Sequence, residues 1–70
     1  MTVKITELRT GFSFEHSDQD ALFESIIKLN KITDCSYSLI RTAITLDNIF
    51  NHGCLYARIE NLSFEVKKGE

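Results

Sequence analysis

The chain has 70 residues, of which 43% are hydrophobic and 26% charged, and its formal net charge at pH 7 is -2. This composition is typical of a folded globular protein rather than a disordered one, and the length predicts a single domain over residues 1–70. No apolar run approaches the ~20 residues of a membrane-spanning helix, and the N-terminus lacks the layout of a signal peptide. We therefore expect a cytoplasmic protein that does not contact a membrane.

The first elements predicted along the chain are two short strands. Apolar and polar residues alternate over residues 2–8 and again over residues 12–15. Gly11 lies between the two segments and can adopt the positive φ that tight turns often require. The pattern predicts an N-terminal β-hairpin.

A helix is predicted over residues 17–31. The Ser17 hydroxyl can accept a hydrogen bond from the backbone N–H of Asp20 and so cap the first turn, where carboxylates are also favoured. Lysines lie toward the other end of the segment, where the helix dipole favours positive charge. Apolar residues recur at helical spacing on one face, namely Leu22, Phe23, Ile26, Ile27 and Leu29.

Residues 35–52 carry two conflicting patterns. The Ile, Thr and Tyr content favours a strand over residues 36–46, followed by a turn or short helical piece over 47–52. The 4-3-4 spacing of Leu39, Ala43, Leu46 and Phe50 instead indicates a helix. We favour the strand and retain a helix at about 36–51 as the alternative.

The last segment, residues 53–67, again alternates with period two. Its apolar residues occupy odd positions up to Ile59 and even positions from Leu62 onward. A change of parity requires either an extra residue or a reversal of the chain. The segment is therefore either one bulged strand or a hairpin that turns at Glu60 and Asn61.

These elements predict a small α+β fold, in which an antiparallel sheet of four to five strands packs on one helix in the order ββαβββ. The alternative with the second helix has the order ββααββ. In either case one face of the helix at 17–31 should be buried against the sheet. The residues expected in the core are Phe23, Ile26, Ile27, Leu39 or Ile40, Ile59 and Phe64.

Residues 15–20 bring one histidine and three carboxylates together, which are residue types able to bind a divalent metal or perform acid–base chemistry. The spacing of an EF-hand is missing. The start of a helix accounts for Ser17, Asp18 and Asp20 without any ligand. We interpret the segment as a helix start.

The two cysteines and two histidines, Cys35, Cys54, His16 and His52, could supply zinc ligands, but no C-x-x-C or H-x-x-x-H spacing supports a site. The isolated glycines form no phosphate-binding loop. We therefore expect no cofactor, no metal and reduced cysteines, and predict that the protein is not an enzyme.

With these chemistries set aside, the sequence predicts a small non-catalytic protein-binding module, which would be an adaptor, an inhibitor or a small subunit. Its size is common among phage and prokaryotic accessory proteins. The expected partner is another protein, and a homodimer is also possible. An exposed surface mixing aromatic, aliphatic and Arg side chains would suit such a role. The predicted binding residues are Tyr37, Arg41, Tyr56 and Arg58, with an alternative acidic patch of Glu15, Asp18, Asp20 and Glu24.

Two other functions compete with this one. The first is a small dimeric nucleic-acid-binding regulator. A helix at 36–51 would favour it, as would a single basic patch made by Lys28, Lys31, Arg41 and Arg58. The slightly negative net charge argues against nucleic acid as a partner. The third candidate is a metal- or thiol-dependent enzyme.

Overall fold

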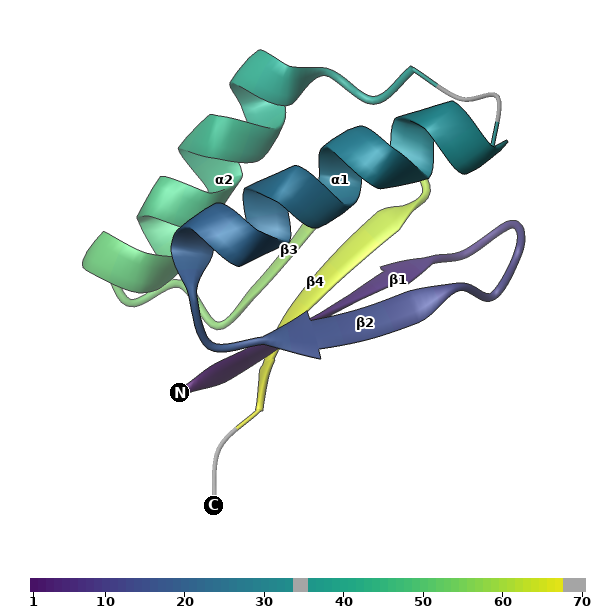
Figure 1. Ribbon diagram of the computed structural model, residues 1–70. Helices are drawn as coiled ribbons and strands as arrows, with labels where there is room; N and C mark the ends of the chain where they lie inside the picture. The colour runs from purple at the N-terminus through teal and green to yellow at the C-terminus, as the bar shows by residue number, and fades with distance from the viewer. Residues whose placement is uncertain (34–35, 68–70) are drawn as a thin grey trace.

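The computed structural model describes residues 1–33 and 36–67 and has the ββααββ order (Figure 1). The α+β class is thus confirmed, in the two-helix form that we ranked second. The elements are β1 (Thr2–Glu7), β2 (Ser13–His16), α1 (Gln19–Thr33), α2 (Leu39–Asn51), β3 (Tyr56–Ile59) and β4 (Leu62–Lys67).

The strands form one four-stranded sheet in the order β2-β1-β4-β3, and every neighbouring pair is antiparallel. The first and last strands of the chain are therefore the two central ones, whereas β2 and β3 form the edges. Both helices cover the same face of the sheet, as Figure 1 shows, and the opposite face is left open. This two-layer arrangement defines which side chains can form a binding surface.

The predicted strand over 36–46 is wrong, because Leu39–Asn51 forms α2. The Ser38 hydroxyl caps the helix by accepting a hydrogen bond from the backbone N–H of Arg41 at 3.2 Å. Thr42, Leu46 and Ile49 recur on one face and are buried. Burial of this face outweighs the modest helix propensity of the isoleucines and threonines.

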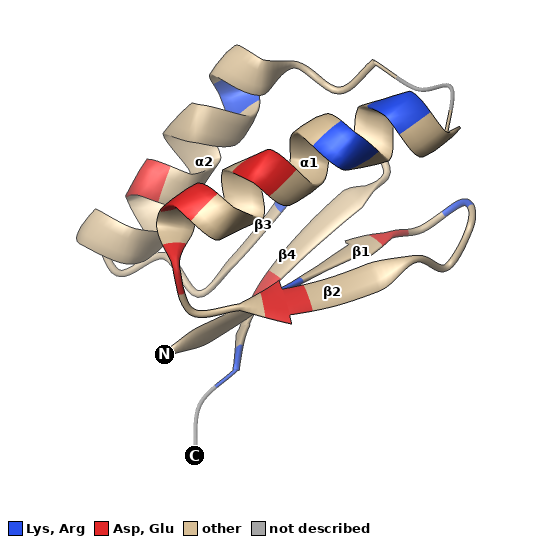
Figure 2. Ribbon diagram, viewed as in Figure 1, with Lys and Arg blue, Asp and Glu red and all other residues tan. Residues whose placement is uncertain are grey.

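The helix predicted over 17–31 is confirmed as α1, with its start shifted by two residues. The capping group is the Asp18 carboxylate, which accepts from the backbone N–H of Ala21 at 2.9 Å, rather than the Ser17 hydroxyl. Carboxylates occupy the N-terminal half of α1, and Lys28 and Lys31 the C-terminal half (Figure 2). This order of charges is favourable in the field of the helix dipole.

The segment from residue 53 onward is a hairpin rather than one bulged strand. Ile59 pairs with Leu62 across a turn made by Glu60 and Asn61, and Glu60 has a φ of 51°. Because the chain reverses between them, Ile59 and Leu62 face the same side of the sheet, and both are buried. This reversal is the physical reason for the parity change in the sequence.

The core lies between the sheet and the two helices. Ile26, Ile59 and Phe64 are buried, as predicted, whereas Phe23 and Ile27 are only half-buried. The expected burial of Leu39 or Ile40 is wrong, since both are exposed. The remaining core side chains come from every layer of the fold, namely Val3, Ile5, Leu22, Leu29, Tyr37, Leu46, Ile49 and Leu62.

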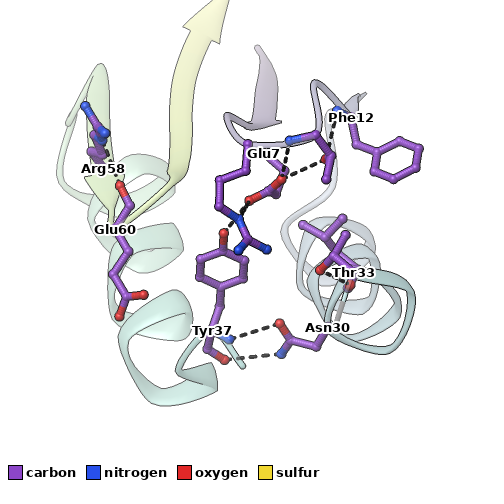
Figure 3. A network of polar contacts seen from close by, with 10 residues as sticks. Glu7, Phe12, Asn30, Thr33, Tyr37, Arg58 and Glu60 are labelled. Carbon is purple, nitrogen blue, oxygen red and sulfur yellow. Dashed lines mark hydrogen bonds and ion pairs between the residues drawn. The ribbon is translucent and has the colours of Figure 1, made fainter. Parts of the chain in front are cut away.

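One charged side chain, Glu7 at the end of β1, is completely buried. One of its carboxylate oxygens accepts hydrogen bonds from the hydroxyl and the backbone N–H of Thr10, at 2.7 and 2.8 Å. The other accepts from the Tyr37 hydroxyl at 2.5 Å and lies 3.4 Å from the Arg9 Nε (Figure 3). These donors, the Tyr37 hydroxyl foremost and then Thr10, lower the pKa of Glu7 from 4.5 to about 2, although burial acts in the opposite direction.

The same tyrosine is held at its backbone by α1. The Asn30 side chain accepts from the backbone N–H of Tyr37 at 3.0 Å and donates to the backbone carbonyl of Tyr37 at 3.2 Å. Tyr37 thus connects the end of β1 to the last turn of α1 and lies two residues before α2 begins. These contacts position α2 beside α1 and so define the surface between the helices.

The burial pattern predicts different costs for two phenylalanines. Phe64→Ala should lower the free energy of unfolding by about 3–5 kcal/mol, because the side chain is fully buried. Phe23→Ala should cost only about 1–2 kcal/mol, since part of that ring is already in contact with water. Urea unfolding followed by circular dichroism measures both, and equal costs would contradict the assigned core.

The depressed pKa of Glu7 predicts an acid-sensitive fold. A carboxylate whose pKa is lower in the folded than in the unfolded state stabilises the fold fully above about pH 4.5, and this contribution is lost as the pH falls toward 2. Glu7→Gln should lower the stability at neutral pH and reduce the further loss between pH 4.5 and 2. Urea titrations across this range provide the measurement. The matched control is Glu65→Gln on the open face, whose stability should depend on pH as that of the parent does. If Glu7→Gln also kept the acid dependence of the parent, the Glu7 carboxylate would not be the stabilising group.

Candidate protein-binding surface

Tyr56 and Arg58 of β3 lie on the open face of the sheet. Their neighbours Ala57 and Ile59 turn toward the helices, so the alternation of the strand directs Tyr56 and Arg58 outward. Tyr56 is 58% exposed, and the Arg58 Nε donates to the backbone carbonyl of Glu60 at 2.8 Å. The other residues that alternate onto this face are polar or charged: Thr2, Lys4, Thr6, Ser13, Glu15, Ser63, Glu65 and Lys67.

The other two predicted binding residues do not join this face. Tyr37 is 4% exposed and its hydroxyl is bonded to Glu7, so its assignment to a binding surface is corrected to a structural one. Arg41 is exposed in the first turn of α2, which belongs to the helical layer on the other side of the sheet. Only Tyr56 and Arg58 of the four lie together.

The alternative acidic patch is likewise divided. Glu15 lies on the open sheet face, where the Lys67 Nζ is 3.5 Å from its carboxylate. Asp18 caps α1, and Asp20 and Glu24 are exposed on the N-terminal half of that helix. Figure 2 shows that these α1 carboxylates share one end of the molecule with an acidic residue of α2.

Between the helices at this end lies a groove that the sequence did not reveal. Its volume is about 230 Å³, and it is lined by Gln19, Asp20, Phe23, Ala43 and Leu46. The half-buried ring of Phe23 contributes an aromatic surface to it. The lining combines apolar side chains with the Asp20 carboxylate and the Gln19 amide, a composition found in the binding sites of proteins.

Two exposed isoleucines of α2 lie outside the lining of this groove. Ile40 is 76% exposed and Ile44 57%, and they lie one helical turn apart. Helical spacing places Ile40 next to Ala43, which lines the groove, and places Ile44 on the side of Ile40 that is further from the groove. The signal was available in the sequence on the helical interpretation, because Ile40 and Ile44 then fall outside the buried face of Thr42, Leu46 and Ile49. Our preference for a strand concealed it.

The charges around the groove are asymmetric. Asp20 lines it from α1, and Asp47 follows Ala43 by one turn on α2, where its carboxylate accepts from the Asn51 side chain at 2.7 Å and lies 3.4 Å from the His52 Nε2. The lysines of α1, Lys28 and Lys31, lie in the C-terminal half of that helix, away from the groove (Figure 2). Arg41 lies in the first turn of α2, two residues before Ala43. The groove therefore opens at the acidic end of the helix pair.

The basic patch required by the nucleic-acid alternative is not assembled. Residues 39–51 are helical, which meets the first condition of that alternative. Lys28, Lys31 and Arg41 lie on the helices, however, whereas Arg58 lies on the open face of the sheet. The four cations thus do not form one surface that could follow a phosphate backbone.

The residues considered for metal or thiol chemistry are spread over the fold. Cys54 is a half-buried free thiol whose Sγ lies 3.1 Å from the backbone carbonyl of Tyr56, and the His16 Nε2 lies 3.2 Å from the Ser25 hydroxyl. Cys35 lies outside the described residues, so the prediction for the cysteine pair stays a prediction. Within residues 1–33 and 36–67, no group of three His, Cys, Asp or Glu side chains could hold a metal ion.

Neither helix in the described part of the chain has the length and apolar character needed to cross a membrane. Comparison with protein-family models, with curated proteins and with solved structures finds no match to this chain.

Proposed function

We propose that the protein is a non-catalytic protein-binding module whose α1–α2 groove receives an apolar segment of another protein flanked by Lys or Arg. The observation that carries this proposal is the exposure of Ile40 and Ile44 on α2, the helix that contributes Ala43 and Leu46 to the groove. Large aliphatic side chains clustered next to an apolar hollow mark interaction surfaces on small proteins. In this role the chain would act as an adaptor, an inhibitor or a small subunit.

The apolar surface supplies the affinity. A partner side chain that enters between Phe23 and Ala43 removes both from water, and the segment that carries it covers Ile40 and Ile44 on α2. Burial of an aliphatic side chain contributes roughly 1.5–3 kcal/mol, so a few such contacts are enough for specific binding. The open sheet face offers less, since Tyr56 stands there among polar and charged neighbours.

The carboxylates at the groove select the kind of partner. Asp20 lines the groove from α1, Asp47 lies one turn after Ala43 on α2, and the lysines of α1 lie in the other half of that helix (Figure 2). A Lys or Arg beside the inserted apolar residues would meet complementary charge, whereas an acidic segment would be repelled. The partner is therefore expected to be an amphipathic segment with basic flanks.

The first test removes the apolar contacts. The paired change Ile40→Lys with Ile44→Lys should weaken binding of the partner by at least on the order of tenfold, because two buried aliphatic contacts are lost. Both side chains are exposed in the free protein, so the fold should be retained by circular dichroism. The partner is captured quantitatively from the native host, identified by mass spectrometry and then titrated against parent and variant.

The matched control carries Tyr56→Ala with Arg58→Glu on the sheet face and should bind like the parent. Loss of binding in this control, with binding retained in the isoleucine pair, would place the partner on the open sheet face and refute the groove.

The second test concerns charge. Asp20→Asn with Asp47→Asn should slow association and reduce its dependence on salt concentration, because the groove then attracts a basic segment less strongly. Glu65→Gln on the open sheet face serves as the control of matched chemistry. Stopped-flow association at several ionic strengths is the measurement. A salt dependence equal to that of the parent would show that the partner does not use these carboxylates.

A further inference from the structure

A second surface lies on the other side of α1, along the edge strand β2. The backbone N–H of Glu7 donates to the carbonyl of Phe12 at 2.7 Å, and Phe14 pairs with Ile5 of β1. Backbone groups alternate in direction along a strand, so those of Ser13 and Glu15 point away from β1. Since β2 is the end of the described sheet, these groups are available to another strand.

An apolar groove accompanies this open edge. It lies between β2 and α1, and its volume is about 200 Å³. Two large apolar side chains among its lining residues are exposed, Phe12 to 50% and Ile32 to 67%. The lining residues are Phe12, Ser13, Phe14, Ser25, Lys28, Leu29 and Ile32.

The edge and the groove together fit an extended peptide. A strand added to β2 would bond to the outward backbone groups and direct every second side chain toward α1, into the groove. Lys28 is the one charged residue that lines the groove as described, and it would attract a carboxylate of the added strand. Lys31 belongs to the same basic half of α1 (Figure 2).

We infer that β2 and the α1 flank bind an extended segment of another protein, with apolar side chains at alternate positions and an acidic residue placed at Lys28. This surface is distinct from the α1–α2 groove and has the opposite charge preference. The inference does not depend on the function proposed above.

A second copy of this chain is the less suitable occupant. The side chains that β2 of a second copy directs toward the helices are Phe14 and His16, with Phe12 just before the strand, and none of them offers Lys28 a carboxylate. A two-fold axis through Glu15 would also place two carboxylates directly opposite each other, which is destabilising between paired strands. A foreign strand with a carboxylate avoids both conflicts.

The other edge of the sheet is less open than β2. On β3, the Cys54 thiol already donates to the backbone carbonyl of Tyr56, and the Arg58 side chain donates to the Glu60 carbonyl at the end of the strand. The two local contacts occupy part of the polar edge that an added strand would need. Neither of the two grooves described above is lined by a residue of β3.

The test uses a short fluorescein-labelled peptide in which every second residue is Thr. The residues between the threonines are Val, Val and Asp, which therefore share one face of the extended peptide. Fluorescence anisotropy should show saturable binding to the folded parent chain. Methylation of the peptide amides that face β2 should weaken binding by on the order of tenfold, whereas methylation of the alternate amides should have little effect. Equal effects of both methylation patterns would overturn strand addition.

Changes in the protein test the same geometry. Ile32→Glu removes an exposed apolar contact, and Ser13→Pro removes an outward backbone N–H, so each should weaken binding of the peptide about tenfold. Ile40→Lys with Ile44→Lys should leave peptide binding unchanged, which separates this inference from the proposed function. Circular dichroism confirms that each variant is folded.

The charge preference gives the sharpest result. Lys28→Glu should lose about tenfold in affinity for the Asp peptide and gain affinity for the same peptide with Lys in place of Asp. If Lys28→Glu did not change the preference from the Asp peptide to the Lys peptide, the proposed role of Lys28 would be wrong. Sedimentation equilibrium completes the test: the parent should sediment at 8.0 kDa, and a dimer abolished by Ile32→Glu would assign the surface to a second copy and refute the inference.

Discussion

The ionised carboxylate of Glu7 is the constraint around which this small fold is arranged. A buried charge is costly unless it is fully hydrogen-bonded, and Glu7 is satisfied only when its own hairpin and Tyr37 are both in place. The hydroxyl of Tyr37 reaches the end of β1 while Asn30 of α1 holds its backbone. One polar network thus ties the central strand of the sheet to both helices.

The position of α2 determines which of its apolar side chains are exposed. The helix buries Thr42, Leu46 and Ile49, whereas Ile40 and Ile44 are left toward water. Within residues 1–33 and 36–67, no further layer covers these side chains. The same geometry that closes the core therefore creates an apolar surface suited to a partner.

The helix α1 lies between two hollows of different character. Toward α2 it contributes Asp20 and Phe23 to a groove at the acidic end of the molecule, and toward β2 it contributes Lys28 and Ile32 to a groove beside an open strand edge. The order of charges along α1, which also suits its dipole, gives the grooves opposite preferences. A module with both could hold two segments at once, which is the arrangement expected of an adaptor.

Local sequence signals were sufficient for the α+β class, the N-terminal hairpin and α1, because alternation, capping carboxylates and helical spacing act over a few residues. They did not decide residues 39–51, where β-favouring composition opposed helical spacing and burial of Thr42, Leu46 and Ile49 settled the outcome. Local signals also could not predict the role of Tyr37, because its hydroxyl donates to the carboxylate of Glu7, which is 30 residues away in the chain. Tyr56 and Arg58 were correctly placed on the outer face by alternation alone, but both grooves were missed. Each groove is formed by elements that only tertiary packing brings side by side, and that packing depends on the network joining Glu7, Tyr37 and Asn30.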